Sequence, residues 1–199
     1  MKRLIPIGVS NRHIHLSEKD LCTLFGEGYQ LTNVKNLTQP GEFAADETVT
    51  IVGPKGQMNR VRILGPIRNI TQVEISKSDS YVLGVNAPIR MSGDINGTPG
   101  LVIIGPKGRV ALDKGVIIAM RHIHMNSNDA REFGVKDKEI VQVKTDGDRG
   151  LIFDHVVVRV SEKYALDFHI DTDEANAAGL KTGDMIELVH IKQRELLAV

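Results

Sequence analysis

Two short histidine motifs in this sequence have the composition and spacing of metal-binding residues. RHIHL occupies residues 12–16, and RHIHM occupies residues 121–125. Side chains alternate along a β-strand, so the two histidines of each motif would project from one face, about 7 Å apart along the chain. Two imidazoles placed in this way can bind one metal ion. Each motif is therefore a candidate half of a metal site.

A second repeat supplies the further ligand that a zinc site needs. Catalytic zinc commonly takes three protein ligands and leaves a fourth position for water or substrate. QVEISKSDSYVLG at 72–84 resembles DFHIDTDEANAAG at 167–179, which makes Glu74 and His169 equivalent. Such sets suit zinc, although they also accept cobalt, nickel or iron, and two of them favour a two-metal site. The predicted ligand sets are His13, His15 and Glu74 for one ion, and His122, His124 and His169 for the other.

The remaining metal-binding residue types lack this support from the repeat. His155 and His190 have no counterpart in the other half, so we expect them to be structural or surface residues. Cys22 aligns with Arg131 on the polar side of a predicted helix. We therefore expect Cys22 to be neither a ligand nor a nucleophile.

The segments around the histidines are predicted to be mostly short strands. Runs rich in Val and Ile are separated by turns such as GPKG and TDGDRG, which is typical of β structure. Short helices are predicted after each motif, from Ser17 to a stop at Gly26 and from Asn126 to Gly134, because each begins at a capping residue and ends at glycine. A longer loop is expected at residues 28–46. The sequence predicts a mainly β fold with short helices.

The repeat also predicts the domain organisation. Two strand-rich halves suggest two similar small β-barrel domains related by a pseudo-twofold, with boundaries at residues 11–120 and 121–199. Strands IPIGVS and VIIAM precede the two histidine motifs, and either could complete the sheet of its neighbour. We place residues 1–10 with the second domain.

Composition excludes several classes of protein. The 25 Lys and Arg balance the 25 Asp and Glu, so no global field attracts nucleic acid or an anionic membrane. No apolar run approaches the roughly 18 to 20 residues that cross a bilayer. A single cysteine excludes an intrachain disulfide, and the start MKRLIPIGV lacks a secretory signal. We expect a cytoplasmic protein that binds neither nucleic acid nor membrane.

Four separated segments resemble, in order, the PduL-type phosphate acyltransferases (phosphotransacylases) of propanediol and ethanolamine metabolism. They are PIGVSNRHIHLS, GPIRNITQVEIS, MRHIHM and FHIDTDEANAAG, and the resemblance covers nearly the whole chain. It implies two β-barrel domains with a dinuclear zinc centre. It also implies reversible conversion of a short acyl-CoA, propanoyl-CoA or acetyl-CoA, and phosphate into acyl phosphate and coenzyme A.

The resemblance assigns roles to residues by position. The family's zinc ligands fall on the six residues that the repeat selects. Its phosphate-binding, catalytic arginine falls on Arg68, which by spacing alone would be an ordinary strand-end cation. Lys55 would by spacing alone be a solvated turn residue. The coenzyme A contacts implied by the resemblance are Val9, Ser10, Asn11, Lys55, Arg62 and Asn176.

Two other functions stay open at this point. The same metal site could activate water, which would make the protein a dinuclear zinc hydrolase of thioesters or phosphoesters. A noncatalytic metal-binding or shell-associated structural protein is the other alternative. Some family members carry an N-terminal extension that directs them into a microcompartment. This sequence begins a few residues before its first strand, so we expect a free enzyme, with a homodimer as its assembly.

Overall fold

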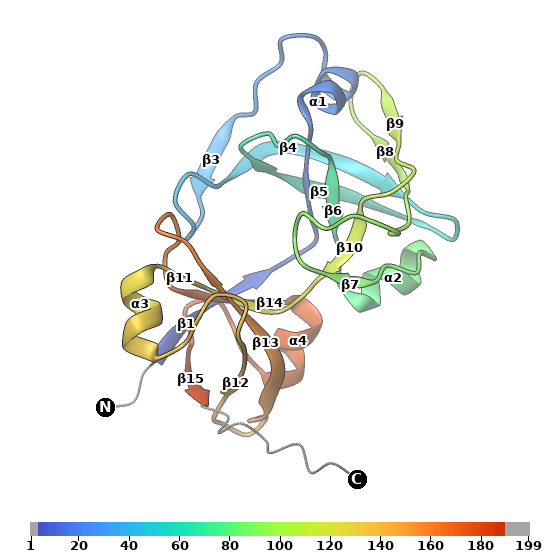
Figure 1. Ribbon diagram of the computed structural model, residues 1–199. Coiled ribbons are helices and arrows are strands. Elements are labelled where there is room, and N and C mark those ends of the chain that lie inside the picture. Colours follow the sequence, from blue (N-terminus) through green and yellow to red (C-terminus); the bar gives the residue numbers. More distant parts are fainter. Residues whose placement is uncertain (1–3, 190–199) are drawn as a thin grey trace. The chain divides into compact units, whose positions relative to one another are not determined.

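The structure is a computed structural model that describes residues 4–189 (Figure 1). It is mainly β with short helices, which confirms the predicted fold class. The chain divides into two compact units. The sheet unit comprises Ser10–Met120 and Asp171–Asp173. The barrel unit combines the N-terminal segment up to Val9 with Arg121–Ile170 and the chain from Glu174 onward.

The sheet unit is built on one curled sheet that does not close. Its strands follow the order β7-β10-β6-β2-β5-β4-β8-β9, and β3 pairs with β4. The helices α1 (Glu18–Phe25) and α2 (Lys77–Leu83) also belong to this unit. The strands are β2 (His13–His15), β3 (Asn33–Asn36), β4 (Phe43–Val52), β5 (Gln57–Gly65), β6 (Gln72–Glu74), β7 (Ile89–Arg90), β8 (Val102–Ile104), β9 (Arg109–Ala111) and β10 (Val116–Ala119).

The barrel unit contains a closed barrel with the strand order β1-β14-β11-β13-β12-β15. The first and last described strands of the chain pair antiparallel within it, with Ile5 opposite Ile186. Strand β10, which leads to the second histidine motif, pairs instead with β6 and β7 of the sheet unit. The elements are β1 (Leu4–Ser10), β11 (His122–Met125), α3 (Ser127–Phe133), β12 (Ile140–Lys144), β13 (Ile152–Val160), β14 (Asp167–Asp171), α4 (Thr172–Ala178) and β15 (Met185–Val189).

The helices that follow the two motifs begin and end as predicted. The Ser17 side chain accepts a hydrogen bond from the backbone N–H of Asp20, and α1 ends at Gly26. Asn126 caps α3 in the same way, and Gly134 closes it in the left-handed conformation. These caps satisfy N–H groups that a helix leaves without partners in its first turn.

The segment at residues 28–46, expected to be a long loop, contains β3 and the start of β4, and these two strands pair with each other. Glu47 accepts hydrogen bonds from the Tyr29 hydroxyl at 3.0 Å and from the Thr32 backbone N–H at 3.1 Å. Burial would raise the pKa of Glu47, but hydrogen bonds from its own backbone N–H, from Thr32 and from Tyr29 outweigh burial and lower it. The strand was missed because NVKN is polar and exposed, and therefore lacks the apolar alternation by which strands are recognised.

Each unit has its own hydrophobic core, and each histidine strand contributes one isoleucine to it. Ile14 and Ile123 are fully buried in the two cores. Alternation turns the flanking histidines to the opposite face of each strand, yet these side chains are buried as well. Buried polar groups need partners, so this second face is where ligands are expected.

The other histidines are not part of this arrangement in the described chain. The side chain of His155 is exposed and lies 3.3 Å from Asp154, in keeping with a surface role. His190 lies outside the described residues. No helix among residues 4–189 is long and apolar enough to cross a membrane.

Candidate metal centre

The first ligand set is assembled by an antiparallel pair of short strands in the sheet unit. The register of β2 and β6 places His13 opposite Glu74. His13 Nε2 lies 3.5 Å from Glu74 Oε2, and His15 Nε2 lies 4.0 Å from Glu74 Oε1. His13 Nδ1 lies 2.8 Å from the carbonyl oxygen of Asn11, so a proton there leaves Nε2 for a metal. One ligand atom from each residue of the set lies within 4.8 Å of the others.

The second ligand set is built the same way in the barrel unit. The antiparallel register of β11 and β14 places His122 opposite His169. The ring centroids of the three histidines lie 4.7 to 5.1 Å apart. Their candidate ligand atoms also lie within 4.8 Å of one another. The structure therefore brings the six predicted ligands together as the two predicted sets of three.

The electrostatics of both sets fit a divalent ion such as zinc. Burial, helped by the neighbouring His13, lowers the pKa of His15 to about 3. Burial and the neighbouring His122 and His169 lower the pKa of His124 to about 2. These imidazoles are therefore neutral at pH 7, the form that binds metal. In addition, Nδ1 of His124 is buried without a hydrogen-bond partner among the described residues.

Arg68 lies beside the first ligand set. Its Nη1 donates to Ser92 Oγ at 3.3 Å, and Ser92 Oγ in turn donates to Glu74 Oε1 at 2.9 Å. Its Nη2 forms an ion pair with Glu42 at 3.1 Å. The Arg68 charge is also one cause of the lowered pKa of His15. The predicted phosphate-binding cation is thus one serine away from a predicted metal ligand.

The arginine of each motif has a role that the sequence interpretation missed. Arg12 makes two hydrogen bonds to Asp79, at 2.9 and 2.7 Å, and this pair raises the pKa of Arg12. Arg121 Nε lies 2.8 Å from Glu174 Oε1. Each pair ties a histidine strand to the helix that follows the third ligand of its set. The signal was present, because the repeat aligns Asp79 with Glu174.

The residues expected to contact coenzyme A are divided between the two units. Val9 and Asn176 belong to the barrel unit, and Ser10, Asn11, Lys55 and Arg62 belong to the sheet unit. Val9 N donates to Thr182 Oγ1 at 3.1 Å, and Asn176 is exposed on α4.

Three of the expected contacts in the sheet unit have defined surroundings. Arg62 lies opposite His13 on β5, and its Nη1 donates to the carbonyls of Ala45 and Asp46. Asn11 supplies the carbonyl next to His13 Nδ1. Lys55 is exposed in the turn between β4 and β5, where its backbone N–H donates to Leu83.

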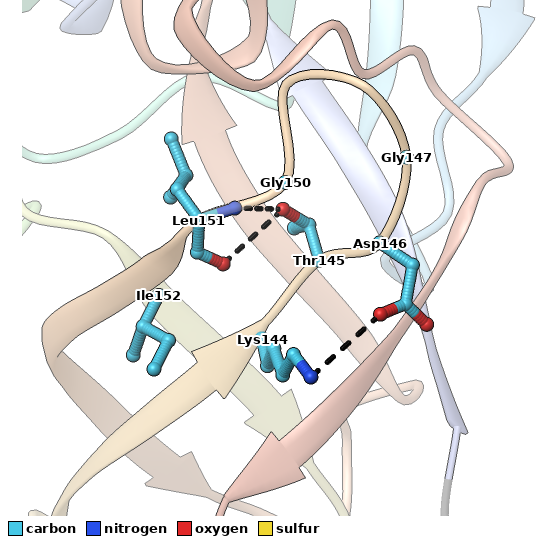
Figure 2. Close-up of a pocket in the computed structure, with 7 residues that line it drawn as sticks. All are labelled: Lys144, Thr145, Asp146, Gly147, Gly150, Leu151 and Ile152. Atoms are coloured by element: carbon cyan, nitrogen blue, oxygen red, sulfur yellow. Dashed lines mark hydrogen bonds and ion pairs between the residues drawn. The ribbon is translucent and has the colours of Figure 1, made fainter.

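A pocket of about 310 Å³ lies elsewhere, at the turn between β12 and β13 of the barrel unit (Figure 2). Its polar groups are used within the turn: the backbone N–H of Leu151 donates to Thr145 Oγ1 at 3.0 Å, and Lys144 lies 3.9 Å from Asp146. It is lined by Lys144, Thr145, Asp146, Gly147, Gly150, Leu151 and Ile152, none of which is a predicted site residue. The candidate chemistry therefore lies at the histidine sets and not in this pocket.

Comparison with known proteins finds relatives that match most of this chain. Residues 6–181 match the family model described as phosphate propanoyltransferase. A phosphate propanoyltransferase from Thermotoga maritima is 64% identical over 186 residues, which cover 93% of this chain and 89% of that protein. One from Salmonella typhimurium is 54% identical, covering 89% and 85%. One from Clostridioides difficile is 52% identical, covering 93% and 88%. On this evidence of extent and identity, the chain belongs to the phosphate propanoyltransferase family.

Proposed function

We propose that this protein is a phosphate acyltransferase that converts a short acyl-CoA and phosphate into acyl phosphate and coenzyme A at a dinuclear zinc centre. Family membership makes it an acyltransferase. The observation that carries the finer proposal is the chain of contacts from Arg68 through Ser92 to Glu74. It provides a cation for phosphate next to a set of residues that can hold a metal.

The ligand sets determine where the two zinc ions would be held. His13, His15 and Glu74 would hold one ion, and His122, His124 and His169 the other. When bound, zinc supplies a Lewis acid for the thioester carbonyl and for the departing thiolate. Propanoyl-CoA and acetyl-CoA are both candidate substrates, since one methylene changes binding by only about 1 to 3 kcal/mol.

Arg68 would bind phosphate and keep it in line with the acyl carbon. A guanidinium has five N–H donors in a planar fork, and its contacts with Ser92 and Glu42 fix its orientation. A phosphate oxygen forms the new bond to the carbonyl carbon, the carbon–sulfur bond breaks, and coenzyme A leaves as the thiolate. Because phosphate attacks the acyl carbon directly, no acyl-enzyme is required, and ionised phosphate needs little help from a general base.

We propose the same coenzyme A contacts as the resemblance implies, because most of these side chains can pair with the phosphates and amides of coenzyme A. Lys55 and Arg62 would supply cations, and Asn11 and Asn176 would supply side-chain amides. Val9 and Ser10 would contribute the strand end before the first motif. Lys55→Ala should raise the KM for the acyl-CoA more than it lowers kcat, because Lys55 would contact the coenzyme A part of the substrate and not its reacting atoms.

The test is thiol release from propanoyl-CoA and acetyl-CoA, with and without phosphate, before and after chelation and zinc restoration. We expect release that needs phosphate, disappears on chelation and returns with zinc. Release without phosphate would indicate a hydrolase and refute acyl transfer to phosphate. Release that persists in metal-free enzyme would refute the zinc centre.

Arg68→Lys tests the phosphate-binding role, with Arg109→Lys as the matched control on exposed β9 of the same unit. Lysine keeps the charge but loses the forked donors, so we expect kcat/KM for phosphate to fall about 10- to 100-fold. The control should leave it unchanged. Equal phosphate kinetics in both variants would exclude Arg68 from phosphate binding.

A further inference from the structure

Each ligand set has a fourth residue on the same strand pair, which neighbours the third ligand on the same face of its strand. It is Gln72 in the sheet unit and Asp167 in the barrel unit, and each lies two residues before the third ligand of its set. Because alternate residues share a face, the fourth residue faces the same way as the ligands. The register pairs are His13 with Glu74 and His15 with Gln72, then His122 with His169 and His124 with Asp167.

Gln72 is almost fully buried, at 1% exposure, and it holds the carboxylate of the third ligand. Its Nε2 donates to Glu74 Oε1 at 2.7 Å and to Ser92 Oγ at 2.9 Å. Its Oε1 accepts from the backbone N–H of Gly93 at 2.7 Å. That backbone donor settles which end of the amide faces Glu74, because only the oxygen can accept from it.

Asp167 is buried to the same extent and holds the imidazole of the third ligand. Its Oδ2 lies 2.9 Å from His169 Nε2. A proton on Nε2 is then shared with the carboxylate, which leaves Nδ1 of His169 for a metal. Gly8 gives this pair its room, since a Cβ there would lie 2.8 Å from Asp167 Oδ2 and 3.0 Å from the His169 ring.

We propose that Gln72 and Asp167 are equivalent positioning residues, each of which orients the third ligand of its metal site. Their polarities match their tasks, because an amide N–H supports a carboxylate ligand and a carboxylate supports an imidazole ligand. The proposal rests on the metal binding in the proposed function and adds the residues that hold its ligands in place. Losing such a partner costs about 10- to 100-fold in metal affinity.

The test uses Gln72→Leu and Asp167→Asn in the full chain. Zinc retained per chain is measured against chelators of graded affinity, and the visible absorption of the cobalt-substituted protein reports ligand geometry. The matched controls are Gln57→Leu and Asp154→Asn, at exposed positions of the same units. We expect each test variant to bind one of its two ions about 10- to 100-fold more weakly, with an altered cobalt spectrum. The controls should match the wild type.

The outcomes separate this inference from the proposed function. Wild-type protein that holds two ions, together with test variants that hold both equally tightly, would overturn the positioning roles alone. Wild-type protein that binds no zinc would overturn the metal centre and the positioning roles with it. If Asp167→Asn does not fold, Gly8→Ala disturbs the same pair without removing its charge. Gly8→Ala should then weaken one ion selectively, and unchanged binding of both ions would refute the role of Asp167.

Discussion

Acid should destabilise the metal-free protein because two of its buried histidines resist protonation. Burial lowers the pKa of His15 to about 3 and that of His124 to about 2. In the unfolded chain both titrate near the ordinary value of about 6.5. As the pH falls below that value, the unfolded state binds protons that the folded state does not, so stability is lost. The loss continues until the pH reaches the folded-state pKa.

The size of this effect follows from the two pKa values. Between about pH 7.5 and about pH 5, each buried histidine should remove about 2 kcal/mol from the free energy of unfolding. His124→Gln should therefore show about 2 kcal/mol less acid destabilisation than the wild type. Any packing defect of the variant acts at both pH values and cancels in the comparison.

Urea unfolding of the metal-free protein at the two pH values measures this difference. Unfolding is monitored by far-ultraviolet circular dichroism, because the chain has no tryptophan whose fluorescence could report it. His155→Gln is the control, because it also removes one histidine from the unfolded chain, but at an exposed position. Because His15 and His124 belong to different compact units, His15→Gln and His124→Gln should each alter the unfolding of their own unit. Equal pH dependence in His124→Gln and the wild type would refute a buried, neutral His124.

Two other substitutions test how the site is held. Asp79→Asn should lower the free energy of unfolding by about 1 to 2 kcal/mol in urea, because it weakens the paired hydrogen bonds from Arg12. The control is Asp94→Asn, because Asp94 lies at the surface, 3.8 Å from Arg90. It should change the free energy of unfolding by less than about 0.5 kcal/mol. Thr71→Val should cost about 1 to 3 kcal/mol by thermal or urea unfolding, because Thr71 Oγ1 accepts from Ser17 N and donates to Asp20. Thr50→Val is the control, because the hydrogen bond of Thr50 is exposed. If Thr71→Val lowers the free energy of unfolding no more than Thr50→Val does, the hydrogen bonds of Thr71 do not stabilise the fold.

The sequence was informative wherever local pattern and local structure coincide. The mainly β fold and the two capped helices were predictable, because strand alternation and helix caps depend on residues near in sequence. The grouping of the ligands was predictable for another reason. Each HxH pair lies on one strand, and the internal repeat carried the third position from one half to the other.

Features that depend on residues far apart in the sequence could not be predicted from local sequence patterns. Closure of the barrel requires β1 to pair with β15 and β14, which nothing local to either strand specifies. The sheet unit has more strands and remains open, although both halves carry the same motif. The partners of Arg12 and Arg121 also come from distant helices, and only the alignment of Asp79 with Glu174 in the repeat indicates them, because an arginine side chain alone does not show which carboxylate it pairs with.

The two ligand sets differ in charge, but each becomes equal in charge when the residue behind its third ligand is counted with it. The first has a carboxylate as its third ligand and a neutral amide behind it, whereas the second has an imidazole as its third ligand and a carboxylate behind it. Each group of four residues therefore contains one carboxylate. With a divalent ion, an ionised carboxylate and neutral imidazoles, each site would keep a net positive charge, which favours binding of a phosphate dianion. Where the first site has the carboxylate Glu74, the second has the imidazole His169, and the position behind it changes from the amide Gln72 to the carboxylate Asp167. Within each site, the third ligand and the residue behind it are therefore expected to vary together.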